Sequence, residues 1–287
     1  NSLPALSGAA LNGPALNGVE GTIMQRVLLT GAAGGVGTML RPLLRLIYPN
    51  LVLSDMRQPD GLRPDEPFRP ANLANLAEVE AAVDGMEGIL HLGGFSVEGP
   101  WETILQSNIV GCYNLFEAAR RKGVRRIVFA SSNHAMGFYP RHSHIGIGAV
   151  PRPDSRYGVS KVFGEAVGAL YADKHGLGVL SIRIGNVGDR PIDKRRLAIW
   201  LHPEDLVQLM RIGLEHPQLR YEVVYGASAN ERTWWDNTRA YQLGYQPKHR
   251  AEDHAAFALA EQAKLAPEPI GDYYQGGPFC ADEYAAR

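Results

Sequence analysis

The sequence contains little cysteine. Its 287 residues include two, Cys112 and Cys280, and no paired CxxC spacing. Disulfide frameworks and structural zinc sites need more or closely spaced cysteines. His142 and His144 lie in a glycine-rich stretch without a third metal ligand nearby, which favours a solvated loop over a metal site. We therefore predict no metal centre and a reducing compartment, the cytoplasm.

Long apolar runs and an excess of charge of one sign are also missing. No run of about 18 apolar residues occurs, so no membrane-spanning helix is expected. The formal net charge is −1 at pH 7, whereas binding to nucleic acid or to anionic membranes needs a concentrated basic surface. We predict a small-molecule partner, with no nucleic acid and no membrane.

The first 23 residues lack an amphipathic period. They repeat Leu, Asn, Gly, Pro and Ala, and the segment from Gly13 to Gly18 is typical of an added linker. They also lack the basic start and apolar centre of a secretory signal. We expect a disordered leader over 1–23 and one folded domain over 24–287, which begins at Met24.

From residue 26 onward, short apolar runs alternate with longer periodic segments. This order indicates repeated βαβ units and predicts an α/β fold, a doubly wound parallel sheet of Rossmann type with a small C-terminal substrate-binding part. The strands are expected over 26–30, 50–54, 88–92, 126–130, 179–184 and 222–225, with a weak one over 67–69. The stretches 136–153 and 185–194 hold no period and are expected to be loops.

Two long helices are expected over 101–122 and 157–175, and Gly123 and Gly176 follow their ends as glycine caps do. Apolar residues recur on each at helical spacing, which predicts the faces that pack on the sheet. In the first helix these are Ile104, Leu105, Ile109, Tyr113, Leu115, Phe116 and Ala119; in the second, Val159, Val162, Phe163, Val167, Leu170 and Tyr171.

A glycine-rich segment, Thr30 to Gly37, follows the first expected strand and opens a helix. Glycines permit a tight turn and close approach to a pyrophosphate, which the free N–H groups and the helix dipole favour. An ordinary tight turn is the alternative, but this context predicts a dinucleotide site. The residues expected to contact the cofactor here are Gly31, Gly34, Gly35, Val36 and Gly37.

Asp55 ends the second expected strand, 24 residues after Gly31. A carboxylate there accepts hydrogen bonds from the adenosine ribose and repels a 2′-phosphate, so NAD is favoured over NADP despite Arg57 nearby. Asn72 and Leu73 are expected beside the adenine. Leu92, Gly93 and Gly94 end another strand at the carboxyl edge of the sheet, where open parallel sheets bind ligands.

A tyrosine and a lysine, Tyr157 and Lys161, stand four residues apart and so share one helix face. The lysine ammonium favours the phenolate that a general base requires. Ser132 follows the fifth strand, where its hydroxyl can hydrogen-bond the reacting oxygen. Such a Tyr–Lys pair is common on helix surfaces, but together with the glycine loop, Asp55 and Ser132 it predicts a catalytic group.

The chain resembles the extended short-chain dehydrogenases, with Gly31, Gly34, Gly37, Ser132 and the Tyr157–Lys161 pair in family order. Within that group it is most similar to the uronate dehydrogenases. The motifs that carry this second likeness are His91 to Glu98, Ser131 to His134, Tyr157 to Lys161, Gly226 to Asn230, Trp234 to Asn237 and Gln275 to Phe279.

The resemblance implies oxidation of the anomeric carbon of cyclic galacturonate or glucuronate by NAD, with release of an aldarolactone. It implies that Tyr157 is the base, that Lys161 holds the nicotinamide ribose, and that Ser132 positions the substrate oxygen. Arg195 would bind the substrate carboxylate with its planar guanidinium. The other implied substrate contacts are Ser96, Asn133, His134, Asn186 and Phe279, and the substrate-binding segments are 133–155, 185–200 and 226–281.

Other interpretations stay open at this point. A nucleotide-sugar epimerase or dehydratase uses the same fold and the same Tyr–Lys pair but retains NAD; about 60 residues after Tyr225 leave little chain for the larger lobe that such enzymes usually have. A regulator that binds the dinucleotide without catalysis is a third class, which intact Ser132, Tyr157 and Lys161 disfavour. The resemblance also implies a homo-oligomer formed through the two long helices.

Overall fold

The central feature of the computed structural model, which describes residues 23–285, is a seven-stranded parallel sheet of order β3-β2-β1-β4-β5-β6-β9. Its strands are β1 (Val27–Thr30), β2 (Val52–Asp55), β3 (Phe68–Pro70), β4 (Gly88–His91), β5 (Arg126–Ser132), β6 (Gly178–Ile184) and β9 (Tyr221–Gly226). The predicted doubly wound α/β fold and all seven predicted strands are confirmed. The expected leader, except Ile23, lies outside the described residues.

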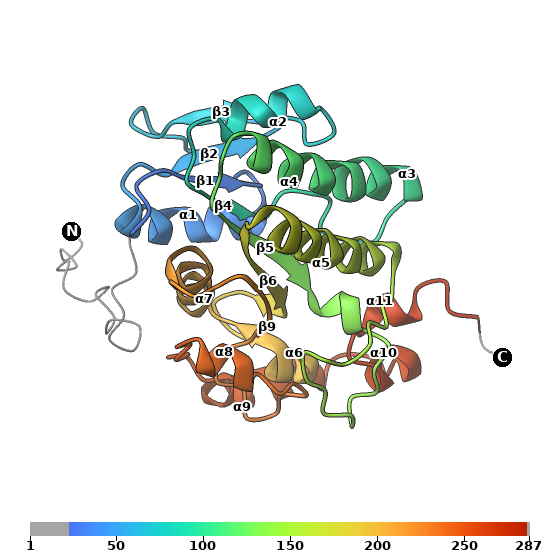
Figure 1. Ribbon diagram of the computed structural model, residues 1–287. Helices are drawn as coiled ribbons and strands as arrows, with labels where there is room; N and C mark the ends of the chain where they lie inside the picture. The colour runs from blue at the N-terminus through green and yellow to red at the C-terminus, as the bar shows by residue number, and fades with distance from the viewer. Residues whose placement is uncertain (1–22, 286–287) are drawn as a thin grey trace.

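Helices cover both faces of the sheet (Figure 1). The helices α1 (Gly35–Ile47) and α7 (Pro203–Glu215) share one apolar cluster with the strands. The helices α2 (Leu76–Val83), α4 (Gly111–Arg121) and α5 (Arg156–His175) share the other. Because both faces are covered, the central strands are apolar without alternation, and Val27, Leu28 and Leu29 are all fully buried.

Smaller elements gather at the lower end of the molecule in Figure 1, beyond β6 and β9. They include a second, two-stranded sheet in which β7 (Asn186–Val187) pairs with β8 (Trp200–Leu201). The loop predicted over 185–194 is therefore wrong at β7. The other elements are η3 (Asn133–Met136), α6 (Lys194–Ile199), α8 (Thr238–Gln242), η4 (Ala251–His254), α9 (Ala255–Gln262), α10 (Pro269–Tyr273) and α11 (Pro278–Ala281).

The helix predicted over 101–122 is present, but a π-helical segment interrupts it. It consists of α3 (Trp101–Ile104), the π-helix η2 (Leu105–Val110) and α4. Within η2, buried Asn108 accepts a hydrogen bond from the Phe95 backbone N–H at 2.7 Å and donates to the Ser160 hydroxyl at 3.0 Å. The wider turn thus joins the loop after β4 to α5, in keeping with the frequent location of π-bulges near functional sites.

The buried face of α5 differs from the predicted one. Val159 and Leu170 are about half exposed, as is Tyr113 on α4, although each was expected to pack inward. Polar and small residues take the inner positions. Gly164 is one of them: it lies directly against the Phe129 ring, and a side chain there would overlap the ring. The inner face of α5 that apolar periodicity predicts is therefore wrong at Val159 and Leu170. No helix within residues 23–285 has the length and apolar character needed to cross a membrane.

Candidate active site

The glycine-rich segment forms the turn between β1 and α1, as predicted. Gly31 has φ +70°, and a Cβ at this position would lie 2.7 Å from the Leu92 carbonyl carbon. At Gly37 a Cβ would run into the carbonyl oxygen of Gly31. No side chain caps α1, whose N-cap is Gly34, so the N–H groups of its first turn are left for a ligand.

A cavity of about 330 Å³ opens at this turn, along the carboxyl ends of β1, β2 and β4. The structure brings together here all the predicted cofactor residues except Lys161, and also Ser96 from the predicted substrate set. The cavity is lined by Gly31, Gly34, Gly35, Val36, Gly37, Asp55, Asn72, Leu73, Leu92, Gly93 and Gly94, among others.

Asp55 is the last residue of β2, and its carboxylate faces the glycine turn. Its two oxygens accept hydrogen bonds from the backbone N–H of Ala33 at 3.0 Å and of Met56 at 2.7 Å. Arg57 is exposed and donates to the Ala33 carbonyl at 2.9 Å. Across the cavity, the Asn72 amide oxygen accepts from the Ala74 N–H at 3.0 Å, and its second lone pair stays available to an adenine amino group.

Tyr157 and Lys161 lie in the first two turns of α5 and are both buried. Ser155 is the N-cap of this helix, and its hydroxyl accepts the Gly158 N–H at 2.9 Å. The Lys161 ammonium donates to the Ala130 carbonyl of β5 at 2.8 Å and lies 5.3 Å from the centre of the Tyr157 ring. The predicted pair is therefore aligned beside the end of β5.

Ser132 is the final residue of β5 rather than a residue beyond it, which corrects the predicted strand end. Its hydroxyl oxygen accepts the His134 backbone N–H at 3.2 Å and so begins the short helix η3. The strand is longer than predicted because its pairing with β6 continues to the partners Ser132 and Ile184.

Arg195 enters the site from α6 and is held in place by protein oxygens. Its Nε donates to the Gln275 carbonyl at 2.8 Å and its Nη2 to the Asn133 amide oxygen at 2.9 Å. Burial, with a smaller effect of Arg196 and Arg141, lowers the pKa of Arg195 to about 10, so it stays charged at neutral pH. Gly277 (φ +68°) leaves room for the guanidinium, since a Cβ there would lie 2.6 Å from Nε.

The cations next to Arg195 are placed differently. Arg196 forms an ion pair with Asp193, the N-cap residue of α6, and Lys194 is exposed. Of the three consecutive basic residues Lys194, Arg195 and Arg196, Arg195 is therefore the one that points into the site.

The remaining predicted substrate residues lie around the same edge. The Asn133 amide nitrogen donates to the Ile184 carbonyl at 3.1 Å, so both ends of this side chain contact protein. The His134 ring stacks on Phe279 of α11, with ring centres 3.9 Å apart, and meets Tyr157 edge-on at 5.8 Å. Ser96 is exposed, and Asn186 is half-buried in β7.

Two acidic residues at this site were missed by the sequence reasoning. The Glu98 carboxylate accepts the Tyr157 backbone N–H at 2.9 Å and pairs with Arg156 at 2.6 Å. Asp154 is buried and accepts a hydrogen bond from His134 Nδ1 at 2.7 Å. Glu98 ends one of the family motifs and Asp154 precedes the Ser155 cap; these positions were the available signals.

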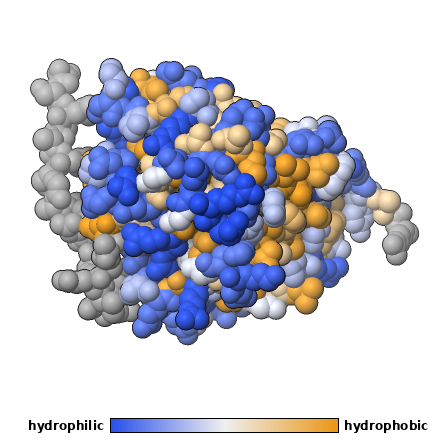
Figure 2. Space-filling model, turned by 45° about the horizontal axis from the view of Figure 1, so that its top comes forward, coloured by the Kyte–Doolittle hydropathy of each residue, from blue (hydrophilic) through white to orange (hydrophobic). Residues whose placement is uncertain are grey.

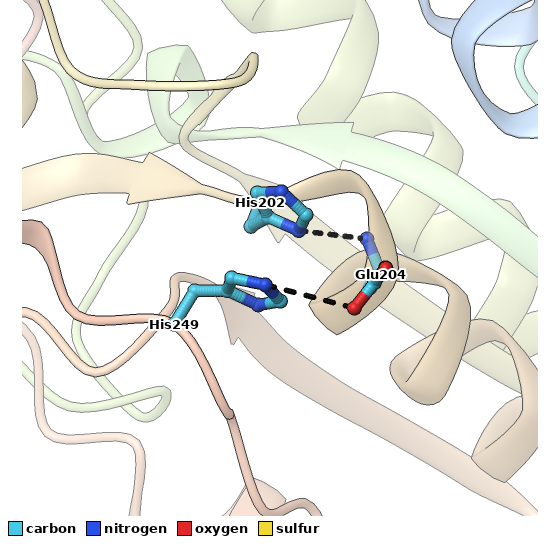
Figure 3. A group of neighbouring side chains, drawn as sticks. All are labelled: His202, Glu204 and His249. Atoms are coloured by element: carbon cyan, nitrogen blue, oxygen red, sulfur yellow. Dashed lines mark hydrogen bonds and ion pairs between the residues drawn. The ribbon is translucent and has the colours of Figure 1, made fainter. Parts of the chain in front are cut away.

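A separate cluster of His202, Glu204 and His249 has spacing that suits a metal ion. His202 is the N-cap of α7, and its Nδ1 accepts the Glu204 N–H at 3.2 Å (Figure 3). The two imidazoles stack with centres 3.5 Å apart, and His249 Nε2 lies 3.6 Å from the Glu204 carboxylate. The lone pair of His202 Nδ1 is already used by the Glu204 N–H. The stacked rings also direct their lone pairs side by side and not toward one point. This arrangement therefore favours a helix cap over a metal site.

Comparison with known proteins finds matches over most of the chain. The family model described as NAD dependent epimerase/dehydratase family matches residues 27–198. Uronate dehydrogenase of Pseudomonas putida is 45% identical over 259 residues, which cover 90% of this chain and 96% of that protein. Uronate dehydrogenase of Agrobacterium fabrum is 43% identical and covers 89% of this chain and 97% of its own.

Solved structures give the same picture. The crystal structure of uronate dehydrogenase from Agrobacterium tumefaciens has a TM-score of 0.86 at 43% identity, covering 91% of this chain and 98% of that one. A mutant of that protein complexed with NAD has a TM-score of 0.85, again at 43% identity, covering 90% of this chain and 97% of that one.

Proposed function

This chain belongs to the uronate dehydrogenases of the NAD dependent epimerase/dehydratase family, and we propose that it oxidises the anomeric carbon of a hexuronic acid, galacturonate or glucuronate, to an aldarolactone with NAD. The observation that carries the proposal is the meeting, at one edge of the sheet, of the buried Tyr157–Lys161 pair with the half-buried, charged Arg195. Arg195 bonds Asn133, and the ring of the next residue, His134, meets Tyr157 edge-on. The Tyr157–Lys161 pair suits the oxidation of an alcohol, and Arg195 suits the binding of a carboxylate.

The residues of the cavity fit NAD. The Gly31 and Gly37 contacts leave no room for a side chain, and the free N–H groups of α1 suit a pyrophosphate. Asp55 suits the ribose hydroxyls and disfavours a 2′-phosphate. Lys161 is proposed to hold the nicotinamide ribose, because two of its three ammonium hydrogens remain after its bond to Ala130.

Tyr157 is proposed as the base that removes the proton from the anomeric hydroxyl. The Ser132 hydroxyl, at the end of β5, holds that oxygen in line, and the Lys161 ammonium stabilises the phenolate. Bound NAD would supply the acceptor for the hydride of the anomeric carbon. As the C–H and O–H bonds break, a C=O bond forms at this carbon, and the ring becomes a lactone.

Arg195 is proposed to bind the substrate carboxylate. A guanidinium has five N–H donors; the bonds to Gln275 and Asn133 use two, which leaves three. Two of these on Nη1 and Nη2 can form a two-pronged contact with a carboxylate. Because this cation is half-buried and forms no ion pair with a carboxylate within residues 23–285, a bound anion would compensate its charge.

The other substrate contacts come from segments 133–155, 185–200 and 226–281, with Ser96 from the loop after β4. We propose that Ser96, Asn186 and Phe279 line the sugar, and that Asn133 contributes chiefly by orienting Arg195. The edge of His134 that faces away from Asp154 is available to a sugar hydroxyl.

We also propose that the chain forms a homo-oligomer through α4 and α5 and works in the cytoplasm. Trp101, Tyr113, Val159 and Leu170, all on this helical layer, are 45–49% exposed. Figure 2 shows apolar residues gathered in patches between larger polar areas on the face turned forward. Cys112 and Cys280 are buried free thiols, which suits a reducing compartment.

The test is NADH formation by the purified protein with NAD and each of galacturonate, glucuronate, galactose, glucose and two nucleotide sugars. We expect NADH in amounts equal to the uronate consumed, and little with the neutral sugars. Conversion of a nucleotide sugar without net NADH, and no reaction with either uronate, would contradict the proposal and favour an epimerase.

A further inference from the structure

The buried contact between His134 and Asp154 has no part in the function proposed so far. His134 Nδ1 lies 2.7 Å from Asp154 Oδ2, and the Asp154 side chain is completely buried. A buried carboxylate is costly unless hydrogen bonds satisfy it.

The surroundings of Asp154 hold its carboxylate in one orientation. The Ser155 hydroxyl, the N-cap of α5, donates to Oδ1 at 2.7 Å. Gly137 and Gly276 lie so close to the other oxygen that a side chain on either would overlap it. The same carboxylate therefore connects the helix that bears Tyr157 with the imidazole of His134.

The orientation of the His134 ring is fixed as well. Phe279 stacks on one face at 3.9 Å, and Tyr157 meets it edge-on at 5.8 Å. Its other nitrogen, Nε2, makes no hydrogen bond to any residue of the described chain, 23–285. This atom is therefore the polar group that the ring can offer to a ligand next to the catalytic tyrosine.

The protonation of the ring decides what Nε2 offers. Burial lowers the pKa of His134 below its ordinary value of 6.5, although Asp154 opposes that shift. A neutral imidazole carries one ring proton, and the carboxylate of Asp154 needs that proton on Nδ1. The lone pair is then on Nε2.

We propose that Asp154 is a positioning residue: it fixes the Nδ1–H tautomer of His134, so that Nε2 accepts a hydrogen bond from the substrate hydroxyl on the carbon next to the anomeric carbon. This assignment rests on the proposed function, because it places Tyr157 at the anomeric hydroxyl. With the anomeric hydroxyl at Tyr157, the hydroxyl on the next carbon is the sugar group assigned to the His134 ring, which meets Tyr157 edge-on at 5.8 Å.

The Asp154→Asn variant separates this role from packing. Because the Ser155 hydroxyl donates to Oδ1, the amide oxygen is expected to stay there and the amide nitrogen to face His134. It then donates to Nδ1 and moves the ring proton to Nε2, which turns the acceptor into a donor. We expect KM for the uronate to rise at least about tenfold, with a smaller change in kcat and unchanged Kd for NAD.

A matched control is Asp205→Asn, since Asp205 is also buried, accepts a serine hydroxyl (Ser228, at 2.6 Å) and faces a histidine, yet lies at the His249 cluster. It is expected to lower stability without raising KM. A 2-deoxy uronate supplies the complementary test: wild type and Asp154→Asn should have equal KM for it. A tenfold difference that persists with the 2-deoxy substrate would overturn the assignment of the hydroxyl.

The tautomer itself is read by ¹⁵N NMR of histidine-labelled wild-type protein with NAD, using His134→Asn to identify the signal. A protonated Nδ1 supports the proposal and a protonated Nε2 overturns it. This outcome does not depend on whether the Asp154→Asn variant folds. If the wild type oxidises no uronate, the proposed function fails, and the NMR signal still decides the part assigned to Asp154.

Discussion

Glu98 holds the N-terminus of α5 through the backbone of Tyr157 itself. Its Oε2 accepts the Tyr157 N–H at 2.9 Å, while its Oε1 pairs with Arg156 at 2.6 Å. A carboxylate that contacts the first turn of a helix satisfies a free donor and complements the helix dipole. The loop after β4, which also lines the cofactor cavity, is thereby joined to the tyrosine.

Replacement of Glu98 by Ala should therefore affect both stability and turnover. We expect a loss of about 1–2 kcal/mol in the free energy of unfolding, as for a lost helix cap, and a lower kcat because the Tyr157 ring is less well fixed. Glu283→Ala is the control, since Glu283 also pairs with Arg156 but is exposed. Equal effects of the two variants in denaturant melts and kinetics would contradict the role of Glu98.

Cofactor preference should depend on Asp55. In Asp55→Ser the repulsion of a 2′-phosphate disappears, so kcat/KM with NADP should rise relative to NAD by about tenfold or more. Asp60→Ser, an exposed acidic residue near Arg57, serves as the control and should leave the ratio unchanged. A ratio that does not move in Asp55→Ser would show that discrimination lies elsewhere in the cavity.

Arg195→Lys keeps the charge but removes the planar group that bonds Gln275 and Asn133. An ammonium cannot make these contacts and a two-pronged carboxylate contact together, so KM for uronates should rise about 10- to 100-fold. Lys194→Met, at the exposed neighbour, should behave as wild type. Steady-state kinetics decide the matter, and an unchanged KM in Arg195→Lys would exclude Arg195 as the carboxylate ligand.

The free energy of unfolding should decrease as the pH is lowered, because His91 is buried in its neutral form. Burial, with a smaller effect of Lys161, lowers the pKa of His91 from 6.5 to about 3. Below pH 6.5 the unfolded chain binds a proton that the folded chain does not, so stability is complete above 6.5 and is lost as the pH falls toward 3. The slope from this group approaches about 1.4 kcal/mol per pH unit.

The variant His91→Asn should have a smaller slope between about pH 6.5 and pH 5, a range above the titration of most carboxyl groups. The exposed His142→Asn is the control and should retain the wild-type slope. Urea melts across this range measure both. Parallel slopes in His91→Asn and wild type would show that the imidazole of His91 is not neutral in the folded state.

The fold and the cofactor cavity were largely predictable because their signals are local. A strand, a glycine turn and a helix are continuous in sequence, and Asp55 is fixed by the end of the next strand. The pattern failed on α5, where Val159 and Leu170 are exposed because Gly164 must fit against Phe129. Apolar period alone does not reveal an inner face composed of small and polar residues.

The substrate side was less predictable because its contacts join distant segments. Arg195 was identified through family resemblance, but its bonds to Asn133 and to the Gln275 carbonyl arise only when three separate segments meet. Asp154 carries no motif of its own, and its role appears only with His134 beside it. Long-range hydrogen bonds of this kind leave no period in the sequence.

The most direct measurement is NADH formation from NAD and galacturonate or glucuronate by wild type and Tyr157→Phe, with NAD binding measured for both. We expect rapid NADH formation by the wild type and a loss of at least about 100-fold in kcat for the variant, with unchanged affinity for NAD. Full activity in Tyr157→Phe, or none in the wild type with either uronate, would contradict it.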